Sequence, residues 1–435
     1  MPTANGTHVS RPLKPGVFAP IPTFFLEGSQ DIDIPTLKKH VAHVGSAGVG
    51  IVMCGSMGEA HHLTADERIQ VVKAAREALD EAGLTTVPII AGTGAGSTRE
   101  TIKLSKDAAQ AGADYTIVIP SGYFAGALAN DRLAIKTFFK EVAEGSPLPV
   151  MVYNYPGASG GIDMDSDLIE EMAAEIPNLC GVKLTCGNVG KLTRIAATVS
   201  IPSFAKEHPR KNKDAPFLVL GGFIDFLLPS LYANAHGAIT GLANLYPHTI
   251  AALWNASLAT LPTATGHASD AVQRLEQAQH LQGIVARADR TIAVSGIAGT
   301  KWLLERKHGY GGVCRRPLGP LPASVGEVLA KHKHVVDISQ VESELEKAHK
   351  TKPYSSTPAV IKATNGVQNG VPVSSSQESS STPTSSLSPA TPSTSAENDQ
   401  SSVTGKKKSH SRSGSLSNSV RSLFGSMKRK KATVA

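Results

Sequence analysis

The sequence predicts a (β/α)8 TIM barrel of the α/β class, followed by a C-terminal helical annex and a disordered tail. Three observations predict this arrangement. Short apolar runs recur eight times over about 230 residues, helical patterns alternate with them, and the composition changes to Ser, Thr and Pro near residue 352. Such alternation is typical of βα units that build a parallel sheet.

The expected strands are short, rich in β-branched residues and bounded by Gly or Pro, as strands buried on both faces are. Eight of them in succession favour a closed barrel. In chain order they are Val17–Phe25, Gly50–Ser56, Val87–Thr93, Tyr115–Pro120, Val150–Tyr155, Gly181–Thr185, Phe217–Gly221 and Gly237–Gly241.

The helices between these strands have recognisable N-terminal signals. Thr64 precedes a stretch with helical spacing of apolar residues, and Glu67 follows at the capping-box position. Ser97 and Glu100 repeat the same arrangement. The remaining helical patterns cover Asp131–Val142, Asp165–Ala174 and Val189–Val199.

An open doubly wound sheet is the alternative architecture. Such a sheet usually carries a Gly-rich phosphate loop after its first strand, whereas here that strand ends in Pro22–Phe25. The run Gly92–Gly96 resembles a phosphate loop superficially, but it follows the third strand and has no well-placed acidic residue downstream. We therefore expect no nucleotide cofactor, and no other cofactor or metal.

The composition divides the chain into four expected regions. The annex would contain helices over Pro247–Leu261, Ala271–Ala288, Gly299–Lys307 and Val325–His332. The region beyond it has almost no large apolar residues and cannot bury a core. The regions are a flexible N-terminus (1–14), the barrel (15–250), the annex (251–350) and a disordered Ser/Thr/Pro-rich basic tail (351–435).

The net charge of +7 comes from the tail. Nine Lys or Arg and no acidic residue lie after residue 405, and subtracting these nine leaves −2 for the rest of the chain. The folded part therefore gives no reason to expect nucleic-acid binding. No stretch reaches the ~18 apolar residues of a membrane span, and residues 1–14 lack a signal-peptide core, so we expect a cytoplasmic protein.

The cysteines and the tail carry two further signals. Cys54 and Cys180 lie in apolar strands, which favours buried, reduced thiols. In the tail, apolar residues share one helical face between basic clusters, namely Leu416, Val420, Leu423, Phe424 and Met427. This face could make a weak contact with an anionic membrane or a protein partner, or the tail could have no function.

Functional residues of a parallel barrel lie at the C-terminal ends of its strands. This rule selects a small set of residues in the expected strands and the loops after them. The set is Ser56, Met57, Tyr123, Tyr153, Lys183, Gly221 and Ile239.

Lys183 and Tyr153 end consecutive strands and indicate Schiff-base chemistry. An amine condenses with a ketone only when it is neutral, and burial in a pocket favours the neutral amine. A tyrosine hydroxyl beside it can transfer the protons of imine formation. The loop Gly55–Glu59 has the small residues that let backbone N–H groups approach a substrate carboxylate, although its glycines could also merely form a turn.

These motifs resemble the N-acetylneuraminate lyase and dihydrodipicolinate synthase family of class I pyruvate aldolases. The resemblance covers about residues 15–320. It is carried by Gly55-Ser56-Met57-Gly58-Glu59, Tyr153-Asn154-Tyr155-Pro156, Gly181-Val182-Lys183, Ile90-Ala91-Gly92-Thr93-Gly94 and Ala243-Asn244.

The resemblance implies a role for each of five residues. Lys183 would form the imine with a 2-oxo acid, and Tyr153 would be the general acid and base. Ser56 would bind the substrate carboxylate and link Tyr153 to Tyr123 of a neighbouring subunit, so that a homo-oligomer, either a dimer or a tetramer, is expected. The Met57 backbone would complete the carboxylate site.

Departures from the family pattern bear on the substrate. Ala158 stands where synthases that make the lysine precursor carry an arginine, so the bidentate clamp for a second carboxylate is missing. Leu184-Thr185 is closer to the sugar-acid branch, and Gly309–Arg315 resembles the 4-hydroxy-2-oxoglutarate branch. We expect a lyase that cleaves a 2-oxo-3-deoxy sugar acid, such as L-threo-3-deoxy-hexulosonate, to pyruvate and an aldehyde.

Four other interpretations remain open at this point. A 4-hydroxy-2-oxoglutarate aldolase would release pyruvate and glyoxylate, and a dihydrodipicolinate synthase-like condensation is less favoured because of Ala158. A metal-dependent aldolase would need ligands at strand ends, where only His61, His62 and His208 are near. A catalytically inactive barrel that acts as a binding protein is the non-enzymatic alternative.

Overall fold

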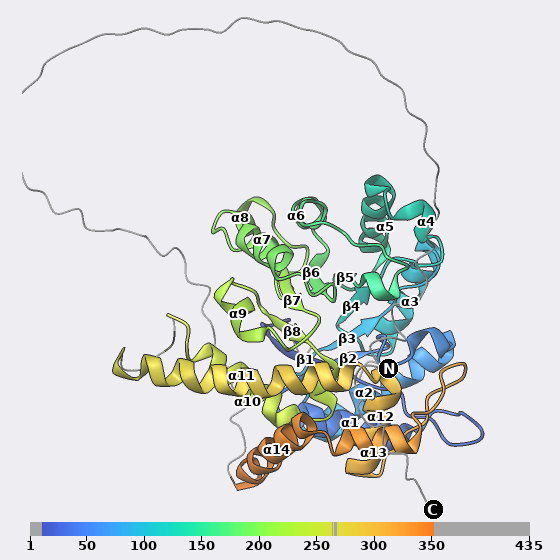
Figure 1. Cartoon of the computed structure of the whole chain (residues 1–435). Coiled ribbons are helices and arrows are strands. Elements are labelled where there is room, and N and C mark those ends of the chain that lie inside the picture. Colours follow the sequence, from blue (N-terminus) through green and yellow to red (C-terminus); the bar gives the residue numbers. More distant parts are fainter. Residues whose placement is uncertain (1–10, 263, 265–267, 352–435) are drawn as a thin grey trace, which may run out of the picture. The chain divides into compact units, whose positions relative to one another are not determined.

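The computed structural model describes residues 11–262, 264 and 268–351 of the chain (Figure 1). Eight parallel strands form a closed barrel in which each strand pairs with its neighbours in sequence and β8 pairs with β1. The expected (β/α)8 architecture is thus confirmed. The strands are β1 (Gly16–Pro20), β2 (Gly50–Met53), β3 (Ile89–Gly92), β4 (Tyr115–Val118), β5 (Val150–Asn154), β6 (Leu179–Leu184), β7 (Leu218–Gly221) and β8 (Gly237–Ile239).

The helices around the barrel begin at the capping residues expected from the sequence. At the start of α2 the Glu67 N–H donates to Thr64 Oγ1 over 3.2 Å, and the Thr64 N–H donates to Glu67 Oε2 over 2.8 Å. Helices α1, α4, α8 and α9 were not expected from the sequence. The helices are α1 (Ile34–Ser46), α2 (Ala65–Glu81), α3 (Thr98–Gln110), α4 (Ala125–Leu128), α5 (Arg132–Gly145), α6 (Ser166–Glu175), α7 (Val189–Val199), α8 (Phe204–Glu207) and α9 (Leu227–Tyr232).

Apolar side chains separate into the interior of the barrel and two layers outside it. The interior cluster includes Phe18, Val52, Tyr153 and Leu220, which come from four different strands. One outer cluster lies between β4–β7 and helices α4–α8. The other joins β1–β3 and β8 to α1, α2 and the C-terminal helices. The annex therefore packs on the half of the barrel that carries the loop after β2.

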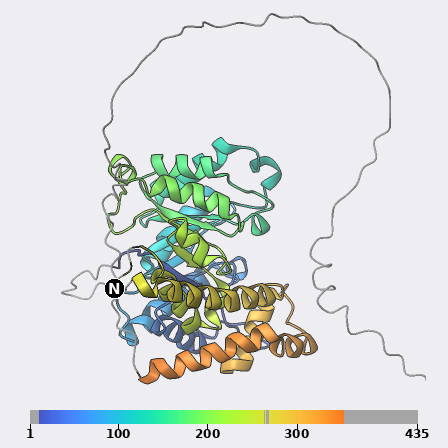
Figure 2. The ribbon, with the colours of Figure 1, turned by 60° about the vertical axis from the view of Figure 1, so that its left-hand side comes forward.

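The annex consists of five helices, one more than expected. Helices α11 and α14 lie against each other and against α10 (Figure 2). The additional helix is α14, which begins directly after His332, where we expected the last annex helix to end. The annex helices are α10 (Pro247–Leu258), α11 (Ala271–Ala293), α12 (Gly296–His308), α13 (Ala323–Ala330) and α14 (Lys333–Thr351).

Several expectations concern residues outside this description. Residues 1–10 of the flexible N-terminus expected over residues 1–14, and the tail with its apolar face at Leu416–Met427, both lie there. Within the described part of the chain, no helix is long and apolar enough to cross a membrane. Cys54 and Cys180 are buried and free, and burial raises the pKa of the Cys54 thiol to about 12.

Candidate active site

Strand register brings Lys183 and Tyr153 together. The two residues are direct partners in the β5–β6 pair, and the neighbour of Lys183 on the other side is Leu220 of β7. Lys183 Nζ lies 3.2 Å from Tyr153 Oη and 4.3 Å from the centroid of the tyrosine ring. Both side chains are only 6% exposed. An amine and a phenol at this distance can exchange a proton directly.

A bulge in β6 precedes the lysine. The register shifts between Val150 and Met151, and Gly181 adopts a φ of +146°. A Cβ on Gly181 would lie 2.3 Å from the Leu218 carbonyl oxygen of β7. Only glycine permits both this backbone conformation and this close approach. The glycine of the Gly181-Val182-Lys183 motif thus sets the position of the strand that carries Lys183.

Tyr155 adds a second aromatic ring beside that of Tyr153, although from the sequence it was only part of the motif Tyr153–Pro156. Its ring stacks on that of Tyr153, with centroids 5.7 Å apart and planes 28° apart. Burial, and then the neighbouring Tyr153, raise the pKa of the Tyr155 phenol. Alternation along β5 could have indicated this, because residues two apart face the same side of a strand.

The loop after β2 presents unpaired backbone donors. The Ser56 side chain is exposed, and Met57 is half-buried with its Cε methyl group close to Gly241 beyond β8. Among the described residues, neither the Ser56 N–H nor the Met57 N–H has a hydrogen-bond acceptor. Over that same part of the chain, no hydrogen bond joins Ser56 to Tyr153. The loop therefore offers donors to an anion, while the expected hydroxyl link is not formed within one chain.

Tyr123 lies apart from the Lys183–Tyr153 pair. It follows β4, its side chain is 90% exposed, and its ring meets that of Phe124 edge-on with centroids 5.1 Å apart. The single chain thus leaves this phenol in solvent rather than beside Tyr153. A large aromatic side chain in such a position suits contact with another protein surface.

The ends of β7 and β8 supply small and apolar surface. A Cβ on Gly221 would lie 3.1 Å from the Phe226 ring, whereas one on Gly222 would lie 2.1 Å from Thr185 Oγ1. The Thr185 hydroxyl oxygen is buried and has no hydrogen-bond partner among the described residues. Ile239 is completely buried in the barrel interior. Gly221 and Ile239 were the residues selected from the sequence, but Thr185, next to Gly222, provides the polar side chain at this end of the barrel.

Ala158, which stands where the synthases carry an arginine, lies in the turn after β5. Ala158 is exposed at the end of a short 3-10 helix (Pro156–Ala158). The hydroxyl of the buried Ser159 donates to the Tyr155 carbonyl oxygen, 2.8 Å away, so it stabilises the turn. A guanidinium is absent at position 158, as the sequence already indicated.

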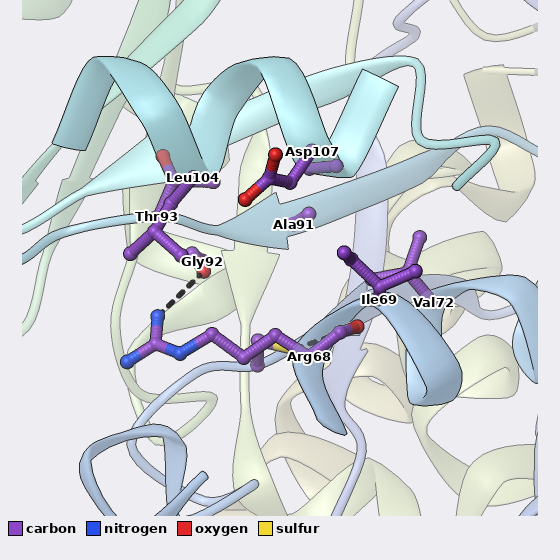
Figure 3. A pocket seen from close by; sticks show the side chains of 10 residues that line it. Arg68, Ile69, Val72, Ala91, Gly92, Thr93, Leu104 and Asp107 are labelled. Carbon is purple, nitrogen blue, oxygen red and sulfur yellow. Dashed lines mark hydrogen bonds between the residues drawn. The ribbon is translucent and has the colours of Figure 1, made fainter. Parts of the chain in front are cut away.

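A small cavity of about 10 Å³ lies outside the barrel wall between α2, β3 and α3 (Figure 3). Arg68 reaches across it, and its guanidinium donates to the Gly92 carbonyl oxygen over 3.3 Å and to that of Ala60 over 2.7 Å. Neither Lys183 nor Tyr153 lines this cavity. Its role is therefore one of support, because Arg68 ties the end of β3 to the residues after the β2 loop.

The histidines considered as metal ligands have other contacts. His62 Nδ1 lies 3.1 Å from Glu59 Oε2, and His208 packs on the Phe204 ring at 4.8 Å. Within residues 11–262, 264 and 268–351, no group of three or more His, Cys, Asp or Glu side chains has an arrangement that could hold a metal ion.

Comparison with known proteins places this geometry in a family. The model of the Dihydrodipicolinate synthetase family matches residues 14–334. The chain belongs to this family. The resemblance inferred from the sequence motifs is thereby confirmed, and the motifs at Lys183, Tyr153 and Gly55–Glu59 all lie inside the matched region.

Individual relatives extend the match over nearly their whole length. The L-threo-3-deoxy-hexylosonate aldolase of Aspergillus niger is 40% identical over 347 residues, which cover 77% of this chain and 98% of that protein. A protein of Emericella nidulans named "Probable 4-hydroxy-2-oxoglutarate aldolase, mitochondrial" is 43% identical over 309 residues, covering 71% and 90%. A solved structure of a dihydrodipicolinate synthase family protein from Coccidioides immitis has a TM-score of 0.63 at 32% identity, covering 78% of this chain and 99% of that one.

Proposed function

We propose that the protein is a class I aldolase that cleaves a 2-oxo-3-deoxy sugar acid, such as L-threo-3-deoxy-hexulosonate, into pyruvate and an aldehyde. The observation that carries the proposal is the buried pair of Lys183 Nζ and Tyr153 Oη, 3.2 Å apart at the C-terminal end of the barrel. Lys183 is the nucleophile and Tyr153 the proton carrier.

The reaction needs no component beyond substrate and water. The Lys183 amine adds to the C2 ketone, and the departing oxygen leaves as water after taking a proton from Tyr153. The C3–C4 bond then breaks, its electron pair moves into the imine to give an enamine, and the Tyr153 phenolate takes the C4 hydroxyl proton as the aldehyde forms. Protonation of the enamine at C3 and hydrolysis of the imine release pyruvate and restore Lys183.

The carboxylate of the substrate binds at the loop after β2. Its position is set by the unpaired N–H groups of Ser56 and Met57, which can act as donors to an anion. Ser56 adds its hydroxyl, and Tyr123 of a second copy completes the proton path, since its own chain leaves that side chain 90% exposed. Gly221 and Ile239 bound the site. The working unit is then a homo-oligomer, a dimer or a tetramer.

Two observations favour a hydroxylated sugar acid over 4-hydroxy-2-oxoglutarate. The Thr185 hydroxyl oxygen is buried beside Gly222 without a partner among the described residues, and it can bond a hydroxyl of the sugar chain. Ala158 offers no cation for the second carboxylate of 4-hydroxy-2-oxoglutarate, nor for that of a synthase substrate. The names of the relatives include both aldolase types, so the second substrate is the alternative.

The first experiment traps the imine. The full-length protein is incubated with pyruvate and sodium borohydride, and the adduct is mapped by mass spectrometry of peptides. We expect a single reduced adduct on Lys183, unchanged in a Lys206→Ala control that alters an exposed lysine. No adduct on a folded protein would overturn the Schiff-base mechanism and leave the metal-dependent or non-catalytic alternative.

A second experiment identifies the aldehyde half. We compare kcat/KM for L-threo-3-deoxy-hexulosonate and 4-hydroxy-2-oxoglutarate in the wild type and in Thr185→Val. The sugar acid should be preferred, and Thr185→Val should lower its kcat/KM by about tenfold while pyruvate trapping stays constant. A preference for 4-hydroxy-2-oxoglutarate would replace the substrate assignment, and turnover of neither would favour a binding protein.

We propose that the protein is cytoplasmic. The name of the Emericella nidulans relative includes the word mitochondrial, which makes a mitochondrial location the alternative. Fractionation of cells that express the natural protein, followed by immunoblotting against markers of both compartments, decides between them. Co-purification with the mitochondrial marker would require the proposed location to be changed.

A further inference from the structure

The loop after β2 has a strained backbone at both ends. Cys54 and Glu59 each have a φ of 52°, in the left-handed region that residues with a side chain rarely adopt. Such conformations cost free energy and persist only where the surroundings hold them in place. The free N–H groups of Ser56 and Met57 lie between these two residues, so their direction depends on what holds the ends.

The Glu59 side chain is held by three donors, two of which come from the annex. Its carboxylate is fully buried and accepts from Lys301 Nζ over 2.8 Å and from the Arg315 N–H over 2.9 Å. His62 Nδ1 approaches the same carboxylate at 3.1 Å. Lys301 lies on α12, and Arg315 lies in the segment after it. The loop is therefore fixed by residues more than 240 positions away.

Lys301 also holds the neighbouring loop. Its Nζ donates to the Thr23 carbonyl oxygen over 2.8 Å, while the Thr23 hydroxyl donates to the Gly58 carbonyl oxygen over 2.7 Å. The ammonium group lies 4.6 Å from the centroid of the Phe25 ring. With both side chains of the ion pair fully buried, a single ammonium joins the segments after β1 and β2.

Stability alone does not account for this pair. Desolvation of two buried charges offsets much of their attraction, and well-packed apolar residues at such sites are often equally or more stabilising. A charged pair does, however, restrict the loop to one geometry, because any other leaves a charge unpaired.

We propose that Lys301 is a positioning residue for the substrate carboxylate, acting through Glu59 on the N–H groups of Ser56 and Met57. This inference rests on the proposed function of the loop as the carboxylate site. It assigns the annex a role in binding the 2-oxo acid, while the imine chemistry at Lys183 is left to the barrel.

The test separates recognition of the carboxylate from imine formation. Borohydride trapping rates on the full-length protein are measured as a function of concentration for pyruvate and for acetaldehyde, which lacks a carboxylate. In Lys301→Met we expect the half-saturating pyruvate concentration to rise by at least about tenfold, as small displacements of binding groups do. The limiting rate with pyruvate and the trapping of acetaldehyde should stay within about threefold.

Three further variants keep the test decisive. Lys301→Met combined with Glu59→Gln leaves no unpaired buried charge, so it should fold even if the single variant does not, and it should show the same weakened pyruvate saturation. Lys301→Arg retains the positive charge and should partly restore saturation. Glu327→Gln is the matched control, because it breaks a 2.5 Å ion pair with Arg306 on the same helix α12 without touching the loop.

The outcomes distinguish this inference from the proposed function. The positioning role would be overturned if the half-saturating pyruvate concentration were unchanged in Lys301→Met and in the double variant with Glu59→Gln. Equal losses of trapping rate with pyruvate and acetaldehyde would overturn it as well. In that case the wild type would still trap pyruvate on Lys183. A wild type that traps neither compound would instead overturn the proposed function, and this inference with it.

Discussion

Lys183 and Tyr153 lie on adjacent strands, and the register of the β5–β6 pair, which is regular from Met151 and Gly181 onward, sets the distance between them. The loop after β2, by contrast, is strained at Cys54 and Glu59 and is held by Lys301 from the annex. One part of the site is thus fixed by strand register and the other by a contact between distant segments. We therefore expect substitutions in β5 and β6 to abolish imine chemistry, whereas substitutions in the annex should weaken substrate binding.

The largest effect should come from the nucleophile. Lys183→Ala should lower kcat by at least about 10⁴-fold, because no other group can form the imine. Lys183→Arg should be equally inactive, since it retains positive charge but not a nucleophilic amine. Steady-state assay of aldehyde release checks both variants, and activity of either within tenfold of the wild type would contradict the assignment.

Loss of the neighbouring phenol should have a smaller effect. Tyr153→Phe should lower kcat by about 10²–10⁴-fold and slow the trapping of pyruvate without abolishing it, because the proton carrier is lost while the Lys183 amine remains. Tyr155→Phe is the matched control, as its ring stacks on Tyr153 and its hydroxyl has no contact with Lys183 Nζ. Equal losses of kcat in the two variants would contradict the assignment of Tyr153 as the proton carrier.

The role of strand register can be tested at Gly181. Gly181→Ala should reduce the free energy of unfolding by about 3 kcal/mol or more, since the new Cβ would meet Leu218 with φ at +146°. Gly190→Ala on α7 is the control, because its φ is not positive and its nearest neighbours are 3.4 Å away. Urea denaturation followed by circular dichroism measures both, and similar stabilities would argue against a constraint at β6.

The folding stability of the protein should depend on pH through histidines that are buried where the annex packs on α1. Burial lowers the pKa of His40 to about 3 and that of His308 to about 4. At a pH between its folded and unfolded pKa values, such a histidine is neutral in the folded state and protonated in the unfolded state. Protonation therefore favours unfolding, and stability is lost as the pH falls below about 6.5.

Between pH 6.5 and 5 the expected loss is about 2 kcal/mol for His40 alone. Thermal denaturation across this pH range measures the loss. His40→Gln should flatten the pH dependence because glutamine does not titrate. Its amide can still bond Asn244, whose Oδ1 is 3.0 Å from His40 Nε2. A slope that is the same in the variant would assign the acid sensitivity to other groups.

The smallest effect should come from the tail. A protein that ends at Thr351 should retain kcat/KM within about twofold, because all the proposed site residues lie in the barrel and the annex. A matched assay of full-length and shortened proteins measures this. A large loss would show that residues 352–435 contribute to catalysis.

The sequence by itself determined those features that depend on near neighbours. Apolar runs predicted all eight strands, and Thr64 predicted the start of α2, because strand burial and helix capping depend on residues a few positions apart. The placement of Lys183 beside Tyr153 followed from the rule that parallel strands present their C-terminal ends together. Helix α1 could also have been found, since Asp33 caps it by accepting from the Thr36 N–H at 3.1 Å.

Only the tertiary structure decided how the β2 loop is held and which small residues surround Thr185. The Glu59–Lys301 contact spans 242 residues, and Arg315 reaches Glu59 across 256. No periodicity along the chain encodes such pairs, because their partners are selected by the packing of the annex on the barrel. Gly221 and Gly222 are likewise indistinguishable in sequence, and the pleat of β7 alone directs one toward Phe226 and the other toward Thr185.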